Sequence, residues 1–292
     1  MAVLHRINDF LSLVKFSHTI FALPFALLGF FLAVLDHGAL RWQKLVLVVL
    51  CMIFARSAAM AFNRWQDRDI DGKNPRTAVR EIPAGVISSK SAMGFILLNS
   101  ALFILCAGLL NTVCLLLSPI ALLVILGYSY TKRFTYLCHF VLGLGLALAP
   151  IGAYLAVTAE WALLPVLYGT VVLLWVAGFD IIYALQDEGF DREEDLYSIP
   201  VRLGTENALL LGRALHLGCT IVLTIAIAFQ ADTYPEFAWL SWLAGGVFLA
   251  CLIYQHSLVK PGDLSKINLA FFTTNGVASL VFGTLTILDV YL

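Results

Sequence analysis

Long apolar runs separated by short polar connections dominate this chain of 292 residues. A helix that crosses a membrane needs about 20 apolar residues in a row. None of the runs alternates apolar and polar positions in the way of a membrane β-strand. The pattern therefore predicts an all-α, polytopic membrane protein with about nine transmembrane helices in a single domain, residues 1–292. The predicted spans are 17–36, 44–62, 91–110, 112–129, 136–157, 162–184, 207–229, 236–256 and 267–288.

The composition agrees with a membrane protein and excludes some partners. Hydrophobic residues make up 61% of the chain and charged residues only 13%, whereas soluble domains carry about 25% charged residues. The net charge of −1 predicts no nucleic-acid partner. The six cysteines lie in or beside apolar runs without a C-x-x-C pair, so we interpret them as buried small side chains.

The distribution of basic residues predicts the orientation of the chain. With the N-terminus placed in the cytoplasm, the inside segments hold fifteen of the eighteen Lys and Arg residues, and the outside segments hold only Arg41 and Lys44. Such a bias is typical of the cytoplasmic side of membrane proteins. Both long polar loops, roughly 63–90 and 185–206, then lie in the cytoplasm. We interpret the first apolar run as a retained span rather than a cleaved signal peptide.

Two acidic motifs occur at the ends of apolar runs. Asn63, Asp67 and Asp71 are four residues apart, and Asp187 and Asp191 repeat the aspartate pair 120 residues later (187 − 67 and 191 − 71). On a helix this spacing places the side chains on one face. Hard oxygen ligands of this kind bind Mg²⁺, which is usually shared with the phosphates of a substrate. The motifs therefore predict a membrane-embedded magnesium site for a pyrophosphate.

The two motif segments also predict an internal duplication. Residues 44–71 and 162–191 each carry an acidic motif at their inner end, and Ile82-Pro83 and Ile199-Pro200 follow at similar distances. Parallel repeats of this kind frame a site between them in some transporters. We therefore expect the helices to surround a central cavity that faces both acidic motifs.

Basic residues in the same cytoplasmic segments are candidates for binding the diphosphate. Lys132 and Arg133 can cap phosphate oxygens, or can simply anchor the chain at the membrane surface. Arg76, Arg80 and Arg202 in the two loops are further candidates, although each can equally pair with a loop acid.

Arg56 and Asp180 are ionisable residues deep inside predicted spans, where charged groups are costly and usually functional. Arg56 lies seven residues before Asn63, and Asp180 lies seven residues before Asp187. Both are therefore expected to face the cavity. The sequence leaves open whether they bind a ligand or pair with each other.

The motifs together resemble the UbiA superfamily of intramembrane prenyltransferases. The resemblance rests on Asn63-x-x-x-Asp67-x-x-x-Asp71, Asp187-x-x-x-Asp191, Tyr128…Lys132-Arg133-x-Thr135 and Ser198-Ile199-Pro200, and covers roughly residues 15–285. The segments Lys15–Ala26 and Thr77–Gly85 are most similar to the 4-hydroxybenzoate polyprenyltransferase branch. Ser129 departs from the proline that many members have after the tyrosine.

The resemblance implies a fold, a reaction and a set of ligands. It implies nine helices around a cavity and Mg²⁺ bound between Asn63, Asp67, Asp71, Asp187, Asp191 and a polyprenyl diphosphate. An aromatic acid related to 4-hydroxybenzoate then attacks the allylic carbon, as in quinone biosynthesis. For that acceptor the candidates are Arg56, Asp180, Tyr128 and Ser129. We expect an integral protein of the bacterial inner membrane, with the N-terminus and the active site on the cytoplasmic side.

Other functions remain as alternatives for the same residues. Some related enzymes prenylate a dihydroxynaphthoate in menaquinone synthesis, and haem O synthase uses a porphyrin. A CDP-alcohol phosphotransferase would carry Asp-Gly-x-x-Ala-Arg, which residues 71–76 do not match. A cation-coupled transporter would place its acids near the membrane midplane, whereas these acids end their helices. The sequence leaves open the prenyl chain length, the acceptor, any catalytic base and the oligomeric state.

Overall fold

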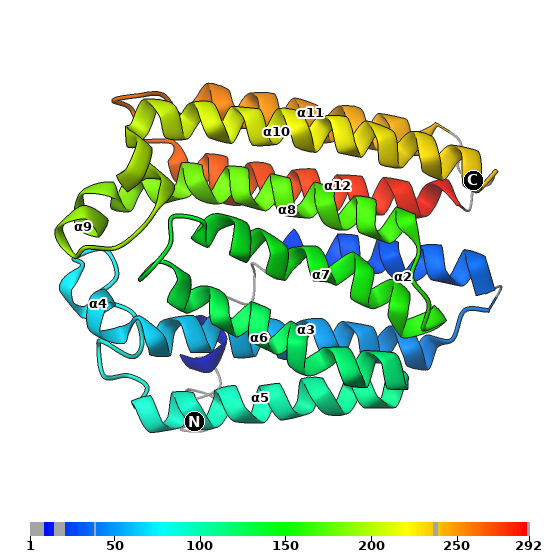
Figure 1. Ribbon diagram of the computed structural model, residues 1–292, viewed down its shortest axis with the longest axis horizontal. Helices are drawn as coiled ribbons and strands as arrows, with labels where there is room; N and C mark the ends of the chain where they lie inside the picture. The colour runs from blue at the N-terminus through cyan, green and yellow to red at the C-terminus, as the bar shows by residue number, and fades with distance from the viewer. Residues whose placement is uncertain (1–8, 15–20, 38, 236–238, 291–292) are drawn as a thin grey trace.

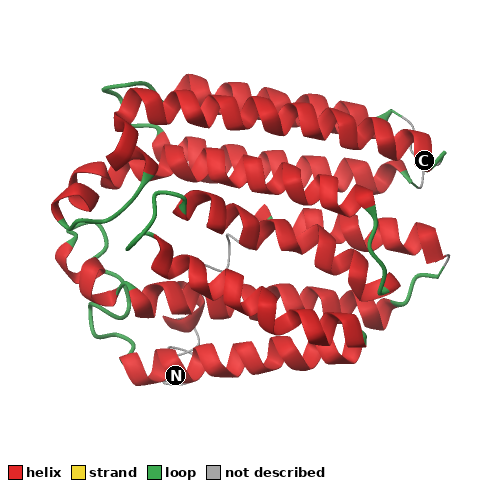
Figure 2. Ribbon diagram, viewed as in Figure 1, coloured by secondary structure: helices red, strands yellow, loops and turns green. Residues whose placement is uncertain are grey.

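The computed structural model describes residues 9–14, 21–37, 39–235 and 239–290. Within these ranges helices supply all the regular elements, joined by loops at the two ends of a bundle (Figures 1 and 2). The helices are α2 (Leu23–His37), α3 (Trp42–Gln66), α4 (Arg68–Lys73), α5 (Ser89–Leu110), α6 (Thr112–Thr131), α7 (Cys138–Thr158), α8 (Leu163–Ala184), η2 (Leu185–Asp187), α9 (Glu188–Glu193), α10 (Ile199–Thr233), α11 (Leu240–Leu258), η3 (Leu269–Thr273) and α12 (Thr274–Asp289).

Seven helical stretches in the described ranges are long and apolar enough to cross a membrane, which confirms an all-α integral membrane protein. Helices α2 and α11 occupy the predicted spans 17–36 and 236–256 without meeting that criterion, and the start of the first span lies outside the described residues. The count of nine therefore stays a prediction. The seven stretches are α3, α5, α6, α7, Leu163–Glu193, α10 and Leu269–Asp289.

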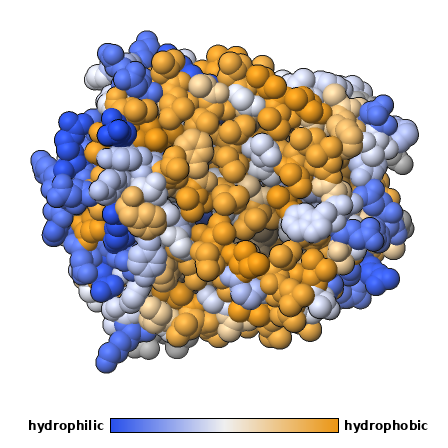
Figure 3. Space-filling view, viewed as in Figure 1, coloured by the Kyte–Doolittle hydropathy of each residue, from blue (hydrophilic) through white to orange (hydrophobic). Residues whose placement is uncertain are grey.

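The surface of the bundle reflects the apolar sequence. A hydrophobic belt covers the middle of the face seen in Figure 3, and polar residues gather at its two ends. The broader polar end carries α4 and α9, the short helices that follow the two acidic motifs (Figure 1). All six cysteines are free thiols, and Cys106 and Cys219 are buried.

Small residues let the central helices pack closely. A Cβ atom on Gly29 of α2 would lie 2.2 Å from the carbonyl oxygen of Pro150 in α7. A Cβ atom on Gly143 of α7 would lie 2.6 Å from the carbonyl oxygen of Leu173 in α8. Such close backbone contacts are a common way for helices to associate within a membrane. They let α2 pack closely on α7, and α7 on α8.

The two motif helices end in the same manner. Helix α3 stops at Gln66 and α8 runs through η2 to Asp187, and the backbone breaks at Asp67 (φ −92°, ψ 2°) and at Asp187 (φ −105°, ψ 2°). A helix of six residues follows each break. The expectation of one continuous helical face through Asn63, Asp67 and Asp71 is therefore wrong in detail, because the helix is interrupted at Asp67. The internal duplication stays a prediction.

Candidate active site

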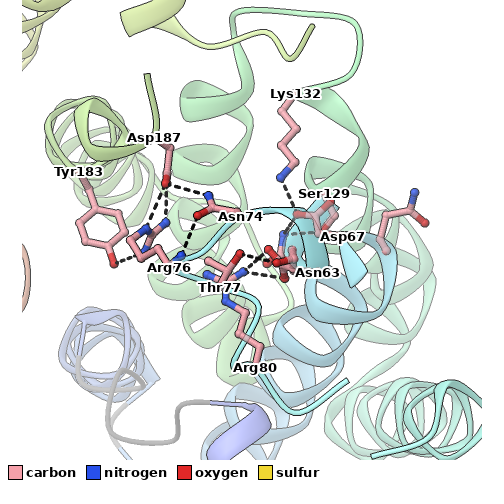
Figure 4. A network of polar contacts seen from close by, with 12 residues as sticks. Asn63, Asp67, Asn74, Arg76, Thr77, Arg80, Ser129, Lys132, Tyr183 and Asp187 are labelled. Atoms are coloured by element: carbon pink, nitrogen blue, oxygen red, sulfur yellow. Dashed lines mark hydrogen bonds and ion pairs between the residues drawn. The ribbon is translucent and has the colours of Figure 1, made fainter. Parts of the chain in front are cut away.

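Asp67 lies at the end of α3 and is almost completely buried, with 2% of its surface exposed. Its carboxylate accepts a hydrogen bond from Asn63 Nδ2 at 3.3 Å. It also pairs with Lys132 Nζ at 2.7 Å and with Arg133 Nη2 at 3.0 Å, both at the end of α6. Figure 4 shows Lys132 reaching toward Asp67 and Asn63. Two cations thus compensate one buried carboxylate, which would otherwise be costly to bury.

Asp71 and Arg80 form a second pair in the first loop. Arg80 Nη1 lies 2.7 Å from both oxygens of Asp71, and Thr77 Oγ1 donates to the backbone oxygen of Asp71 at 3.1 Å. Asp71 is 5% exposed. The loop acid and the loop arginine therefore hold each other beside Asp67.

Asp187 pairs with an arginine from the loop that follows the first motif. Arg76 donates from Nε to Asp187 Oδ1 at 3.0 Å and also contacts Oδ2 through Nη2. Asn74 Nδ2 lies 3.4 Å from Asp187 Oδ1, and Tyr183 lies beside the guanidinium (Figure 4). Burial lowers the pKa of Arg76, but the hydrogen bonds and the charge of Asp187 outweigh it and raise the pKa above its usual value. Arg76 therefore remains charged and ties the first loop to the second motif.

Asp191 faces the same group of residues from α9. Its carboxylate has a hydrogen bond with Ser198, and the charges of Lys132 and Asp187 act on it. Lys132 thus acts on acids of both motifs, on Asp67 through an ion pair and on Asp191 through its charge. The structure brings both acidic motifs to one polar site, as the sequence predicts.

The donor set of this site fits Mg²⁺ in its chemistry. In the described part of the chain, no three acidic, histidine or cysteine side chains lie close enough together to form a complete metal site. Lys132, Arg80 and Arg76 lie against the carboxylates instead. Mg²⁺ does not need an all-protein cage, because it keeps several waters and shares phosphate oxygens. Carboxylate and amide oxygens on both motifs therefore fit a Mg²⁺ ion that arrives with a diphosphate.

Arg202 does not join this group. Its guanidinium lies over the ring of Tyr136, 5.5 Å from the ring centroid, and the side chain is exposed. No contact between Arg202 and a motif acid is recorded over residues 39–235. Arg202 is therefore the weakest of the predicted diphosphate ligands.

An apolar cavity of about 380 Å³ lies next to the acidic site. Helices α3, α5, α6 and α7 line it, from Met60 and Tyr128 near the acidic end to Val48 and Cys114 at the other end. Along α3 this is about 18 Å at 1.5 Å per residue. Such a cavity suits an extended hydrocarbon chain.

Arg56 is the charged residue that lines the cavity. Among the described residues, its Nε is buried without a hydrogen-bond partner. Tyr128 also lines the cavity, and it is close enough for the charges of Asp67, Asp180 and Arg56 to act on it. Ser129 lies apart from them, because it is buried beside Asn63 Nδ2 at 3.5 Å on the polar side. Of the predicted acceptor residues, Arg56 and Tyr128 therefore face the cavity and Ser129 supports the acidic site.

Asp180 does not pair with Arg56. It accepts a hydrogen bond from the ring of His139 in α7, with Nδ1 2.7 Å from Asp180 Oδ2. The ion pair between Arg56 and Asp180 that the sequence left open is therefore wrong. Buried carboxylates take whichever donor the packing supplies, and here a helix between the two motif helices supplies it.

Three residues of the site carry no signal in the sequence that would single them out. His139 contacts Asp180, Asn74 contacts Asp187, and Tyr183 contacts the arginine that binds Asp187. Each of the three stands in an ordinary apolar or turn sequence. His139 lies 41 residues from its partner, so no local spacing indicates the contact. Asn74 follows the first acidic motif, but asparagine is common in turns, so its position does not indicate the contact with Asp187.

Comparison with known proteins places the chain among prenyltransferases. The model of the UbiA prenyltransferase family matches residues 22–277. The chain is 32% identical over 249 residues to 4-hydroxybenzoate octaprenyltransferase from Aliivibrio fischeri, a match that covers 84% of this chain and 83% of that protein. The 4-hydroxybenzoate octaprenyltransferase from Photobacterium profundum is 30% identical over 97% of this chain and 96% of its own length.

Solved structures show the same fold. The apo structure of a UbiA homologue from Aeropyrum pernix K1 superposes with a TM-score of 0.82 at 33% identity, and covers 93% of this chain and 98% of that one. A UbiA homologue from Archaeoglobus fulgidus, whose structure contains GPP and Mg²⁺, superposes with a TM-score of 0.74 at 20% identity, and covers 97% and 100% of the two chains. The chain belongs to the UbiA prenyltransferase family.

Proposed function

We propose that this protein transfers a polyprenyl group from a polyprenyl diphosphate to 4-hydroxybenzoate in a Mg²⁺-dependent reaction. The observation that carries the proposal is the polar site built from both acidic motifs at the mouth of the apolar cavity. The curated relatives named 4-hydroxybenzoate octaprenyltransferase support the same reaction and its place in ubiquinone biosynthesis. The homologue with bound GPP and Mg²⁺ supports the ligand pair.

The acidic site binds the diphosphate end of the substrate in this proposal. Asn63, Asp67, Asp71, Asp187 and Asp191 would hold Mg²⁺, which supplies positive charge that stabilises the departing diphosphate. Lys132, Arg133, Arg76 and Arg80 bind the phosphate oxygens, since each already carries a carboxylate at hydrogen-bond distance. A diphosphate oxygen can replace that carboxylate oxygen, because Arg and Lys bind both anions in the same manner.

The cavity binds the two carbon skeletons. The prenyl chain lies along α3 and α6, where the lining is almost wholly apolar. The apolar walls also exclude water, which would otherwise trap the allylic cation. Arg56 binds the carboxylate of the aromatic acid, because its buried Nε lacks a partner and a buried donor without an acceptor is destabilising. Tyr128 and Asp180 flank the ring of the acceptor.

Product masses test this function. Purified protein is incubated with Mg²⁺, a polyprenyl diphosphate and an equal mixture of 4-hydroxybenzoate and 1,4-dihydroxy-2-naphthoate. We expect one prenyl group on 4-hydroxybenzoate and little product from the naphthoate. Prenylation of the naphthoate alone would assign the enzyme to menaquinone synthesis, and the absence of both products would contradict a transferase.

We also propose that the acidic site faces the cytoplasm, in the inner membrane of a bacterium. The basic residues near the acidic end support this orientation, since cytoplasmic loops of membrane proteins are enriched in Lys and Arg. The bacterial origin of the relatives supports the inner membrane as the location.

Cysteine labelling from each side of the membrane tests the orientation. The structure offers exposed positions in both loops, Val79 and Glu193, and one at the opposite end, Glu160. In spheroplasts, a membrane-impermeant maleimide is expected to label a cysteine at Glu160 and to leave Val79 and Glu193 unlabelled until the membrane is broken. The unsubstituted protein gives the background from the native thiols. Labelling of Val79 and Glu193 from opposite sides would contradict a shared site.

A further inference from the structure

We infer that His139 is a positioning residue for Asp180 and that Asp180 is the proton acceptor for the hydroxyl group of the aromatic substrate. The inference rests on the proposed function and names a base that neither the sequence nor the comparisons assign. The juxtaposition that carries it is a short chain of hydrogen bonds from the backbone of Ile199 through His139 to Asp180.

The two hydrogen bonds of His139 fix its tautomer. Its Nε2 lies 3.3 Å from the backbone nitrogen of Ile199, and its Nδ1 lies 2.7 Å from Asp180 Oδ2. A backbone N–H can only donate, so Nε2 must accept and carries no hydrogen. Nδ1 therefore carries the proton that is donated to Asp180. The fold holds this donor in place, and only 3% of the side chain of His139 is exposed.

Asp180 differs from the motif acids in its partner. Asp67, Asp71 and Asp187 are each paired with a lysine or an arginine. Asp180 instead contacts a histidine, which holds one of its oxygens in place. The other oxygen, Oδ1, has no hydrogen-bond partner among the described residues, and 23% of the side chain remains exposed. Asp180 therefore keeps free lone pairs that can take a proton.

Asp180 is not part of the cavity lining, but it is near Tyr128, which is. The charges of Asp180 and Arg56 both act on Tyr128, which lines the cavity. An aromatic acid whose carboxylate binds Arg56 lies against the same tyrosine. A hydroxyl group at the far side of its ring can then approach Asp180. Besides His139, the ionisable groups around this pair are Cys138, Asp191, Tyr128 and Arg56.

The chemistry balances with these groups alone. The allylic C–O bond breaks and its electron pair leaves on the diphosphate, while a C–C bond forms to the ring carbon beside the hydroxyl. Asp180 takes the hydroxyl proton during this attack, so no positive charge remains on the ring. The proton of the attacked carbon is then released to the departing diphosphate, and Asp180 returns its own proton to the ring oxygen. Asp180 therefore ends each turnover without the proton, as it began.

Backbone contacts make this arrangement rigid. Ile199 is the first residue of α10, and Ser198 before it has a hydrogen bond with Asp191 of the second motif. His139 therefore connects the proposed base with the loop that carries the diphosphate site. Precise placement of such groups is worth orders of magnitude in rate.

Replacement of His139 tests the inference. His139→Leu should lower kcat by about 10- to 100-fold, which is part of the roughly 10²–10⁴-fold effect of a positioned base. The KM values for the prenyl diphosphate and for 4-hydroxybenzoate should change less than about threefold, since the binding groups remain in place. Asp180→Asn should lower kcat at least as much as His139→Leu.

Two further variants and a second acceptor separate positioning from a merely structural role. His139→Asn keeps an N–H donor near the place of Nδ1 and should recover much of the lost kcat. The acceptor 3-fluoro-4-hydroxybenzoate has a more acidic hydroxyl and depends less on a base. With this acceptor, the ratio of wild-type to His139→Leu kcat should therefore shrink. His216→Leu, at another buried histidine outside the cavity lining, controls for the general effect of losing a buried ring.

Failure of this inference can be distinguished from failure of the proposed function. If the wild-type protein transfers no prenyl group, the proposed function and this inference both fail. If the wild-type protein is active and His139→Leu keeps full kcat, only the inference is overturned. It is also overturned if both KM values and the melting temperature of His139→Leu collapse together and His139→Asn rescues nothing, because that result describes a structural histidine.

Discussion

Replacing Asp67 with asparagine is expected to lower kcat by about a thousandfold, which corresponds to about 4 kcal/mol of transition-state stabilisation. Asp67 is the carboxylate on which Asn63, Lys132 and Arg133 converge. Asparagine keeps the shape of the side chain but removes the charge that binds a divalent cation. Lys132 and Arg133 remain partly solvated in the variant, with 28% of each side chain exposed. The fold should therefore survive, and the melting temperature in detergent should change by only a few degrees.

Asp69 offers a matched control for this variant. It lies two residues away on α4, and 82% of its side chain is exposed beside Arg68. Asp69→Asn removes the same charge from the same segment without touching the site, and should keep nearly full activity. Initial rates at saturating Mg²⁺ and substrate measure both variants. Comparable activity in Asp67→Asn and in Asp69→Asn would show that Asp67 is a solvated helix end with no part in catalysis.

Replacing Arg56 with leucine is expected to raise the KM for the aromatic acid by about ten- to a hundredfold. A hydrogen bond between ionised groups contributes about 1.5–3 kcal/mol, and each 1.4 kcal/mol is a factor of about ten. The KM for the prenyl diphosphate should stay nearly constant. Arg56 lies eleven residues before Asp67 on α3, which is roughly 16 Å along the helix axis. At that separation the substitution should leave the diphosphate site unchanged.

A variant at the diphosphate end of the site makes the test of Arg56 sharper. Lys132→Met removes a cation whose recorded contact is with Asp67 at 2.7 Å, and should raise the KM for the prenyl diphosphate instead. The thermal stability of Arg56→Leu should be unchanged or higher, because leucine removes a buried charge that has no paired acid. Equal shifts of both KM values in Arg56→Leu, or a large loss of folded protein, would contradict a binding role for Arg56.

The two acidic motifs can be found in the sequence because their signals are local. Four-residue spacings and a repeat 120 residues later identify Asp67, Asp71, Asp187 and Asp191, and the structure brings both motifs to one end of the bundle. The apolar runs likewise predict an all-helical membrane fold. What the runs could not predict is the break at Asp67, because helix propensity alone does not place the end of a helix that tertiary contacts interrupt.

The partners of the charged groups could not be predicted, because they depend on packing between distant helices. Arg76 reaches Asp187 across 111 residues, and His139 reaches Asp180 across 41 residues. Spacing favoured Arg56 and Asp180 as a pair, since both precede their motifs by seven residues. Helix α7 lies between the motif helices and supplies His139 instead.

The number of diphosphates released per acceptor prenylated tests Mg²⁺-dependent prenyl transfer most directly. Purified protein, Mg²⁺, a polyprenyl diphosphate and ring-labelled 4-hydroxybenzoate are combined, and both products are counted over time. A coupled, Mg²⁺-dependent transfer gives a ratio of one, and no release of either product when Mg²⁺ is removed by a chelator. Release of diphosphate in excess of prenylated acceptor, or prenylation that persists without a divalent cation, would contradict it.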